Sequence, residues 1–243
     1  MKKLPFLLIV VILLAGCTAQ QIQQAQKTAK GVLDDYLEED QLTSDQVASG
    51  LKEALVKGIT KGTNSASKVD GYLKNPKIAI PFPPDVQKVA DKLRDLGMGS
   101  QVDKFVTTLN RGAEEAAKEA KPIFVNAIKG MTVQDAWGIL KGEDDAATTY
   151  LRGKTFDQLK SKFQPVMQKA LDQTNATKYY SDLVNTYNKI PFIEKVNPDL
   201  NDYATNRALD GLFTLVAQEE EKIREDPVAR TTDLLKKVFA QQD

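Results

Sequence analysis

The chain of 243 residues contains no histidine and a single cysteine, Cys17. Without imidazole there can be no Ser-His-Asp or Cys-His catalytic arrangement and no zinc site that uses histidine. Because Cys17 has no partner within the chain, an internal disulfide is excluded and the fold must be held by packing. These absences argue against an enzyme, and any catalysis would depend on carboxylates, lysine, arginine, tyrosine or hydroxyl groups. We expect no cofactor.

The chain also lacks an excess of either charge, with 33 basic and 33 acidic residues. Proteins that bind nucleic acid usually carry a basic face and a high pI, so we expect no nucleic-acid partner. The acidic cluster at residues 143–145 lacks the alternating ligands and the glycine of an EF-hand loop. Acidic residues are favoured at a helix N-terminus in any case. We therefore expect no metal site.

What the sequence does contain, at its start, is a secretory signal. Met1–Lys3 is basic, Leu4–Leu14 is an apolar run, and Leu14-Ala15-Gly16-Cys17 closes it. The run is shorter than the about 20 residues that a transmembrane helix needs. A cysteine directly after two small residues resembles a bacterial lipobox. This resemblance predicts removal of residues 1–16 and lipidation of Cys17, which would anchor the chain in a membrane.

Residues 17–42 follow the predicted cleavage site and are expected to be a flexible tether. In Gram-negative lipoproteins an aspartate directly after the lipidated cysteine retains the protein in the inner membrane. Thr18 occupies that position here. The resemblance therefore favours the periplasmic face of the outer membrane, with the membrane as one partner and an envelope protein as another.

From residue 43 to 240 the apolar residues recur at helical spacing, which predicts a single all-α domain of about eight helices. The first of these helices is expected to fade near Gly62. Pro122 should interrupt the helix that starts near Val102, because proline cannot continue a helical hydrogen-bond ladder. Residues 72–81 contain the only β-like run, which predicts at most a short extended segment or hairpin there.

Capping signals divide the later part of the domain into helices. Thr132 can cap a helix over residues 133–140. A short helix is expected at 146–151. Thr155 and Gln158 then match the capping-box pattern, so a new helix is expected to begin at that point.

Glu219 is the most unusual polar residue in the pattern. It falls within the apolar stripe of the helix predicted from Pro198 to Arg224, where an unpaired carboxylate is costly, and Glu220 flanks the stripe. We expect Glu219 to pair with an arginine across the core, and the candidates are Arg152, Arg224 and Arg230. Two other interpretations are a ligand-binding or acid–base carboxylate and a partly exposed site near a helix end.

Asn110 and Glu114 lie at the border of the apolar stripe between Val102 and Ala120. Their spacing places them one helical turn apart. One interpretation is a polar pocket. The simpler one is a solvated border with a hydrogen bond to a neighbouring loop. Arg111 points away from the stripe and is expected at the surface.

A series of segments in this domain stands out in a fixed order, namely Gly50–Leu55, Lys77–Pro84, Asn110–Glu114, Ala120–Phe124, Asp145–Thr148, Ala208–Phe213 and Glu220–Phe239. In order and density they resemble the DUF4197 family of proteobacterial lipoproteins, a domain of unknown function. The family usually has Asn-Arg-Ala-Ala-Glu, and this chain has Gly112 in place of the first alanine. The resemblance implies an exported helical lipoprotein and supplies no activity or catalytic residues.

The sequence therefore favours a non-enzymatic binding or structural module of the bacterial envelope. Two alternatives stay open. One is a carrier of an apolar or amphipathic small ligand in a cavity between helices, with Glu219 and an arginine holding its polar end. The other is a hydrolase or lyase that uses Glu219 with Glu114 or Glu220 as acid and base.

Overall fold

A computed structural model of the chain describes Lys27 and residues 43–173, 176–189, 191–192, 195, 197, 199–225 and 238. The chain divides into two units, Met1–Thr43 and Ser44–Asp243, and the helices named below belong to the second. The predicted signal segment, Cys17 and Arg230 lie outside the described residues.

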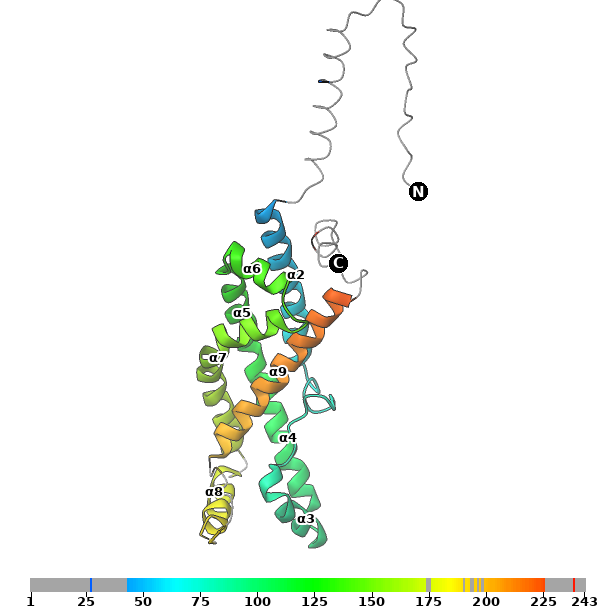
Figure 1. The fold of residues 1–243 in the computed structure, drawn as a ribbon. Helices are drawn as coiled ribbons and strands as arrows, with labels where there is room; N and C mark the ends of the chain where they lie inside the picture. Colours follow the sequence, from blue (N-terminus) through cyan, green and yellow to red (C-terminus); the bar gives the residue numbers. More distant parts are fainter. Residues whose placement is uncertain are drawn as a thin grey trace, which may run out of the picture. The chain divides into compact units, whose positions relative to one another are not determined.

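The described part of the second unit is all-α, as predicted, and no strand occurs in it (Figure 1). Its helices are α2 (Ser44–Ala66), α3 (Gln87–Asp95), α4 (Gly99–Ala116), α5 (Ala120–Lys129), α6 (Val133–Leu140), α7 (Ala146–Asp172), α8 (Ala176–Tyr187) and α9 (Leu200–Glu225). Two 3-10 turns, η1 (Pro84–Val86) and η2 (Ala117–Glu119), precede α3 and α5. When adjoining helical segments are joined, the described residues form about six helices rather than eight.

Helix α7 accounts for part of this difference. The short helix expected at 146–151 and the new start expected at Thr155 are both wrong, because α7 runs unbroken through both positions. Thr155 is buried in the middle of the helix, where its hydroxyl donates to the carbonyl of Leu151 at 2.7 Å. A threonine that bonds to the preceding turn in this way does not cap a helix start.

Two local signals are confirmed. Thr132 caps α6, since its Oγ1 accepts from the backbone N–H of Asp135 at 3.0 Å and its own N–H donates to Asp135 Oδ2 at 2.9 Å. The backbone N–H of Thr132 and its hydroxyl both donate to Asp135 Oδ2, and these bonds hold the pKa of the Asp135 carboxyl below its usual value. The interruption expected at Pro122 is present too, because α4 gives way to η2 and α5 begins two residues before the proline.

Helices α7 and α9 form the centre of the domain. Helix α9 packs against α2, α4 and α7, and Figure 1 shows it crossing these neighbours. Phe213 of α9 meets Phe124 of α5 edge to face, with ring centroids 5.5 Å apart. Helix α2 continues past Gly62 to Ala66 instead of fading, and a Cβ at Gly62 would lie 3.6 Å from the carbonyl oxygen of Leu215 on α9. Among the described residues, none of the helices combines the length and apolar character of a membrane span.

The α2–α3 loop, residues 67–83, contains no strand and no hairpin, which is within the expectation of at most a short extended segment or hairpin there. Its middle consists of consecutive turns, in which Asn75 N–H donates to the Tyr72 carbonyl at 3.0 Å and Ala79 N–H donates to the Asn75 carbonyl at 2.8 Å. Tyr72 is fully buried, and its hydroxyl donates to the carbonyl of Ala208 on α9 at 2.6 Å. The loop is therefore part of the core, docked on α9.

Gly211 is the residue of α9 that allows this docking. A Cβ at this position would lie 2.8 Å from Cε1 of Tyr72 and 3.0 Å from Cβ of Ile78. We expect Gly211→Ala to lower the free energy of unfolding by about 1–3 kcal/mol, because the buried loop must move to admit a methyl group. Chemical denaturation measures the change.

Gly153 of α7 is the matched control, because a Cβ there meets nothing within 4 Å. Since alanine is the better helix former, Gly153→Ala should raise the free energy of unfolding by about 0.5–1 kcal/mol. Effects of the same sign and size at the two glycines would contradict the close approach of the loop to α9.

Candidate functional site

Asn110, Arg111 and Glu114 of α4 form a polar cluster against the α2–α3 loop, here named the α4 clamp. Asn110 is fully buried and Glu114 is 4% exposed. The expected hydrogen bonds to a neighbouring loop are present, and the expectation of a solvated border is wrong. The loop covers this side of α4, so the side chains of Asn110 and Glu114 are buried beneath it.

Asn110 forms hydrogen bonds to the loop backbone of the kind that a neighbouring strand would form. The backbone N–H of Ile80 donates to Asn110 Oδ1 at 2.8 Å, and Asn110 Nδ2 donates to the carbonyl of Ile80 at 2.9 Å. The same amide group donates to the Val106 carbonyl of α4 at 2.8 Å. The β-like residues around Ile80 thus have their backbone groups satisfied by a side chain, which explains why no hairpin forms there.

Glu114 holds the other end of the loop. Its Oε1 accepts from the backbone N–H groups of Tyr72 at 3.1 Å and Leu73 at 3.2 Å. Its Oε2 accepts from Arg111 Nη1 at 2.6 Å, and Arg111 Nη2 donates to Asp70 Oδ1 at 2.6 Å. Asp70 has a positive φ of 68°, a conformation that aspartate tolerates better than most residues. The arginine therefore links a buried acid to a half-exposed acid in the loop.

The charges of the α4 clamp reinforce one another. Hydrogen bonds from Lys74 and then Arg111 hold the pKa of Asp70 below its usual value. Hydrogen bonds to Glu114 and Asp70 raise the pKa of Arg111. Burial, and then the charge of Glu114, raises the pKa of the Tyr72 phenol, so Tyr72 stays a neutral donor. The cluster thus places the Arg111 guanidinium between the carboxyl groups of Glu114 and Asp70.

Glu220 of α9 forms a second polar cluster, at the start of α7. Its Oε1 accepts from the N–H of Ala147 at 2.9 Å, and its Oε2 accepts from the N–H and the hydroxyl of Thr148, each at 2.8 Å. The N-cap residue Asp145 provides no side-chain hydrogen bond to this helix. A carboxylate from another helix therefore satisfies the free N–H groups of the first turn and stabilises the positive end of the helix dipole.

Arg224 completes this second cluster. Glu220 and Arg224 together are named the α9 clamp. Arg224 Nε and Nη2 donate to Glu220 Oε1 at 3.1 and 2.9 Å. Its Nη2 also donates to the carbonyl of Ile139, in the last turn of α6, at 2.8 Å. The pair thus binds the C-terminal end of α6 and the N-terminal end of α7 to α9.

Among the described residues, the charged partners of Glu219 are lysines, and neither Arg152 nor Arg224 pairs with it. Glu219 forms ion pairs with Lys61 of α2 at 3.1 Å and with Lys222 at 2.7 Å, and its side chain is 13% exposed. A Cβ built at Gly58 of α2 would lie 3.4 Å from the Cβ of Glu219. Gly58 and Glu219 therefore lie next to each other where α2 packs against α9.

The two arginine candidates that the structure describes, Arg152 and Arg224, have other partners. Arg224 belongs to the α9 clamp, and Arg230 lies outside the described residues. Arg152 pairs with Asp210 at 2.9 Å and lies over the Phe213 ring, 4.6 Å from its centroid. Arg111, expected at the surface, has a side chain 39% exposed and belongs to the α4 clamp.

The two buried carboxylates are engaged with the protein itself. Glu114 and Glu220 each accept hydrogen bonds from two backbone N–H groups and one arginine. A cavity of about 10 Å³ borders Glu220 and Arg224, which is room for a single water at most. Within the part of the chain that the structure describes, no group of three potential metal-ligating side chains occurs.

Sequence reasoning missed Asp70, Tyr72, Thr148 and Lys61 as partners in these clusters. Their bonds join residues far apart in the chain, and no local spacing encodes them. The segment Asp145–Thr148 did carry a signal, since it stood out in the sequence and forms the helix start that Glu220 caps.

The fold and the two clamps together define an all-α domain. Its buried polar side chains hold its own loops and helix ends in place. The family described as "protein of unknown function (DUF4197)" matches residues 41–240, and the chain belongs to this family. Comparison with curated proteins and with solved structures gave no match. The matched residues include both clamps.

The α9 clamp should carry a large share of the domain's stability. We expect Glu220→Ala to lower the free energy of unfolding by about 3–5 kcal/mol, because it leaves Arg224 without its carboxylate and two N–H groups without acceptors. Denaturant unfolding followed by circular dichroism measures this change.

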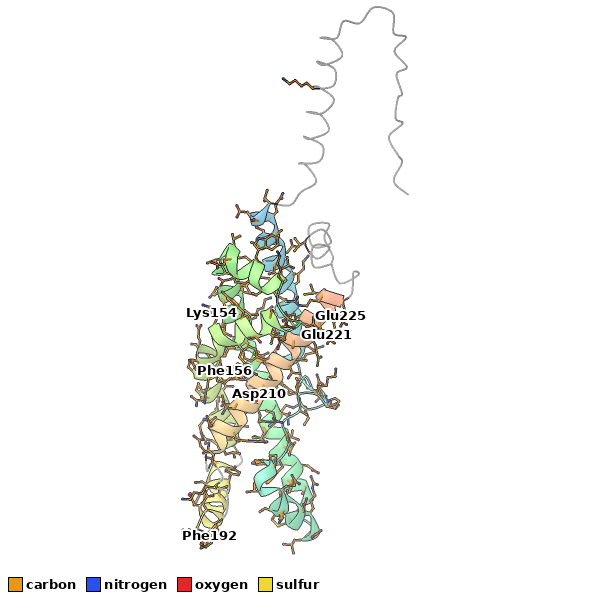
Figure 2. The ribbon with its side chains drawn as sticks, in the orientation of Figure 1. Lys154, Phe156, Phe192, Asp210, Glu221 and Glu225 are labelled. Atoms are coloured by element: carbon orange, nitrogen blue, oxygen red, sulfur yellow. The ribbon has the colours of Figure 1, made fainter. Side chains whose placement is uncertain are left out.

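Glu221 is the adjacent control, because it is exposed on α9 (Figure 2). Its substitution by alanine should change the free energy of unfolding by no more than about 0.5 kcal/mol. A small effect at Glu220 that matches the one at Glu221 would contradict the capping role.

Asp70 should make the stability of the α4 clamp depend on pH. Its folded-state pKa lies below the ordinary value of 3.8, so its contribution is fully present above that value and is lost as the pH falls through the folded-state pKa. The stability difference between the wild type and Asp70→Asn should be constant above about pH 5 and shrink at lower pH.

Unfolding measured between pH 2 and 7 tests this expectation. Asparagine also tolerates the positive φ, so the substitution removes the charge and keeps the backbone. The exposed Asp144→Asn is the control and should show no such difference. A difference for Asp70→Asn that grows as the pH falls would overturn the assignment.

Proposed function

We propose that the protein is a lipid-anchored envelope lipoprotein whose helical domain serves as a binding or structural module. The proposed location is the periplasmic face of the outer membrane of a Gram-negative bacterium. The observation that carries this proposal is Leu14-Ala15-Gly16-Cys17 directly after an apolar run. These residues lie outside the described part of the chain, so the support comes from the sequence.

The chemistry of the proposed anchor follows from this stretch. The Cys17 sulfur would first receive a diacylglyceryl group. Cleavage before Cys17 and acylation of the new amino group would follow, and the protein would then carry several acyl groups. One acyl chain holds a protein only weakly in a bilayer, and two or more hold it stably. Thr18 at the next position favours the outer membrane over the inner one.

The interior of the domain supports a binding or structural role over the two alternatives. An acid–base pair requires carboxylates that can reach a substrate, whereas Glu114 and Glu220 are buried and bonded to backbone N–H groups. Glu219 is held between two lysines. The cavity beside Glu220 and Arg224 holds about 10 Å³, which is too small for a carrier's ligand at that place.

Substitution at Cys17 tests the anchor directly. We expect Cys17→Ser to accumulate as an unprocessed chain that incorporates no labelled fatty acid, because only the thiol can form the thioether. Metabolic labelling and intact mass measure both properties. Normal processing and labelling of this variant would contradict the proposal.

Thr18→Asp is the companion variant for the location. It keeps the thiol, so labelling should be unchanged, and the protein should move from the outer-membrane to the inner-membrane fraction. Unchanged fractionation would argue against the proposed site while leaving the lipid anchor intact.

A further inference from the structure

Two adjoining hollows lie on the outer side of α2 and the α2–α3 loop, and together they are named the α2 groove. The first has a volume of about 560 Å³ and is lined by Val56, Lys57, Thr60, Lys61, Asn64, Ser65 and Lys68. The second, of about 380 Å³, shares Ser65 and Lys68 and is completed by loop residues Val69, Asp70, Gly71, Lys74, Asn75 and Pro76. The first volume is within the range of small-ligand sites, about 300–1,000 Å³.

The lining of the α2 groove is strongly basic. Lys57, Lys61 and Lys68 follow one another at intervals of four and seven residues, a spacing that puts them on one side of α2 and its C-terminal end. Lys74 adds a fourth positive charge from the loop. The one carboxylate in the lining is Asp70, and it is already bonded to Arg111 and Lys74.

The lysines remain available to an anion. Lys61 pairs with Glu219 and Lys74 with Asp70, yet their side chains are 68% and 74% exposed. Lys57 pairs with Glu53, with a side chain 45% exposed. An exposed ion pair such as Lys57–Glu53 contributes little free energy, about 0–1 kcal/mol, so an anion can compete for that ammonium group. The acids paired with Lys61 and Lys74 have side chains only 13% and 28% exposed, so an anion would bind these two lysines beside their existing partners.

The α4 clamp keeps one wall of the α2 groove in place. Glu114 bonds the N–H groups of Tyr72 and Leu73, which lie between the groove residues Gly71 and Lys74 in the chain. Arg111 holds Asp70 itself. Because this wall is already ordered before a ligand binds, binding costs less conformational entropy.

We propose that the α2 groove binds a phosphate group, presented by a lipid headgroup or by a small soluble phosphate compound. Lysine binds phosphate as a point charge, and the lining adds hydroxyl donors from Thr60 and Ser65 and an amide from Asn64. The lining contains no arginine, so an anion there would be held by point charges and single hydrogen bonds instead of paired guanidinium bonds. The proposal rests on the proposed function in taking the domain to be a binding module.

The test titrates the full chain in neutral detergent and follows the backbone amide signals by NMR. The probes are inorganic phosphate, glycerol 3-phosphate, and phosphatidic acid added to the micelles. Saturable shifts at Ser65 and Lys68 are the expected result. Tighter binding of phosphatidic acid than of glycerol 3-phosphate would identify a headgroup, and equal affinities would identify a soluble compound.

Variants at Lys68 decide whether the groove is responsible. We expect Lys68→Gln to raise the dissociation constant about tenfold, because a charge-assisted bond is lost, and Lys68→Arg to restore most of the affinity. Lys154 of α7, exposed and away from the groove lining, is the matched control (Figure 2), and Lys154→Gln should bind as the wild type does.

Three results would overturn the proposal. They are the absence of saturable shifts with every probe, an unchanged affinity in Lys68→Gln, and an equal loss in Lys154→Gln. Circular dichroism of each variant shows that it is folded. The anchor is read separately from the mass at Cys17, so a failure of lipidation and a failure of phosphate binding are distinguishable.

Discussion

The domain depends on one physical constraint, which is that a buried carboxylate must be surrounded by donors. Glu220 meets this constraint with the free N–H groups at the start of α7 and with Arg224. Helix α7 has no side-chain cap of its own, so its first turn would otherwise hold unpaired donors in the core. The acid of one helix and the end of another therefore satisfy each other, and α9 fixes where α7 begins.

The α4 clamp solves the same problem for a loop. The α2–α3 loop is built of turns, and turns leave N–H groups that apolar packing cannot satisfy. Glu114 and Asn110 accept from these groups, while Tyr72 fills the space that Gly211 leaves on α9. Both clamps join an acid to an arginine that reaches a further segment. In this arrangement the N–H groups of Tyr72, Leu73 and Ile80 are all paired with side chains of α4.

Sequence analysis could predict what is encoded locally. The cap at Thr132 depends on residues three apart, and the boundaries of α9 follow from its apolar spacing, so both were predictable. Thr155 shows the limit of such motifs, because the same hydroxyl can cap a helix or bond back within one. Glu219 shows a second limit. Helix α9 is covered on several sides, so helical spacing places a residue toward the interior without saying which neighbour it meets. One of the partners of Glu219, Lys61, belongs to another helix, and the spacing within α9 cannot indicate it.

The two clamps differ in their relation to the surface. Glu220 and Arg224 are both nearly enclosed, with side chains 4% and 7% exposed, so the α9 clamp acts within the core. The α4 clamp instead runs from buried Glu114 through Arg111 to Asp70 in the wall of the α2 groove. Arg111 is bonded to Glu114 on its buried side, and its other Nη nitrogen pairs with Asp70, the one carboxylate in the lining of the groove. The same ion chain that gives the loop its conformation therefore leaves the α2 groove positively charged.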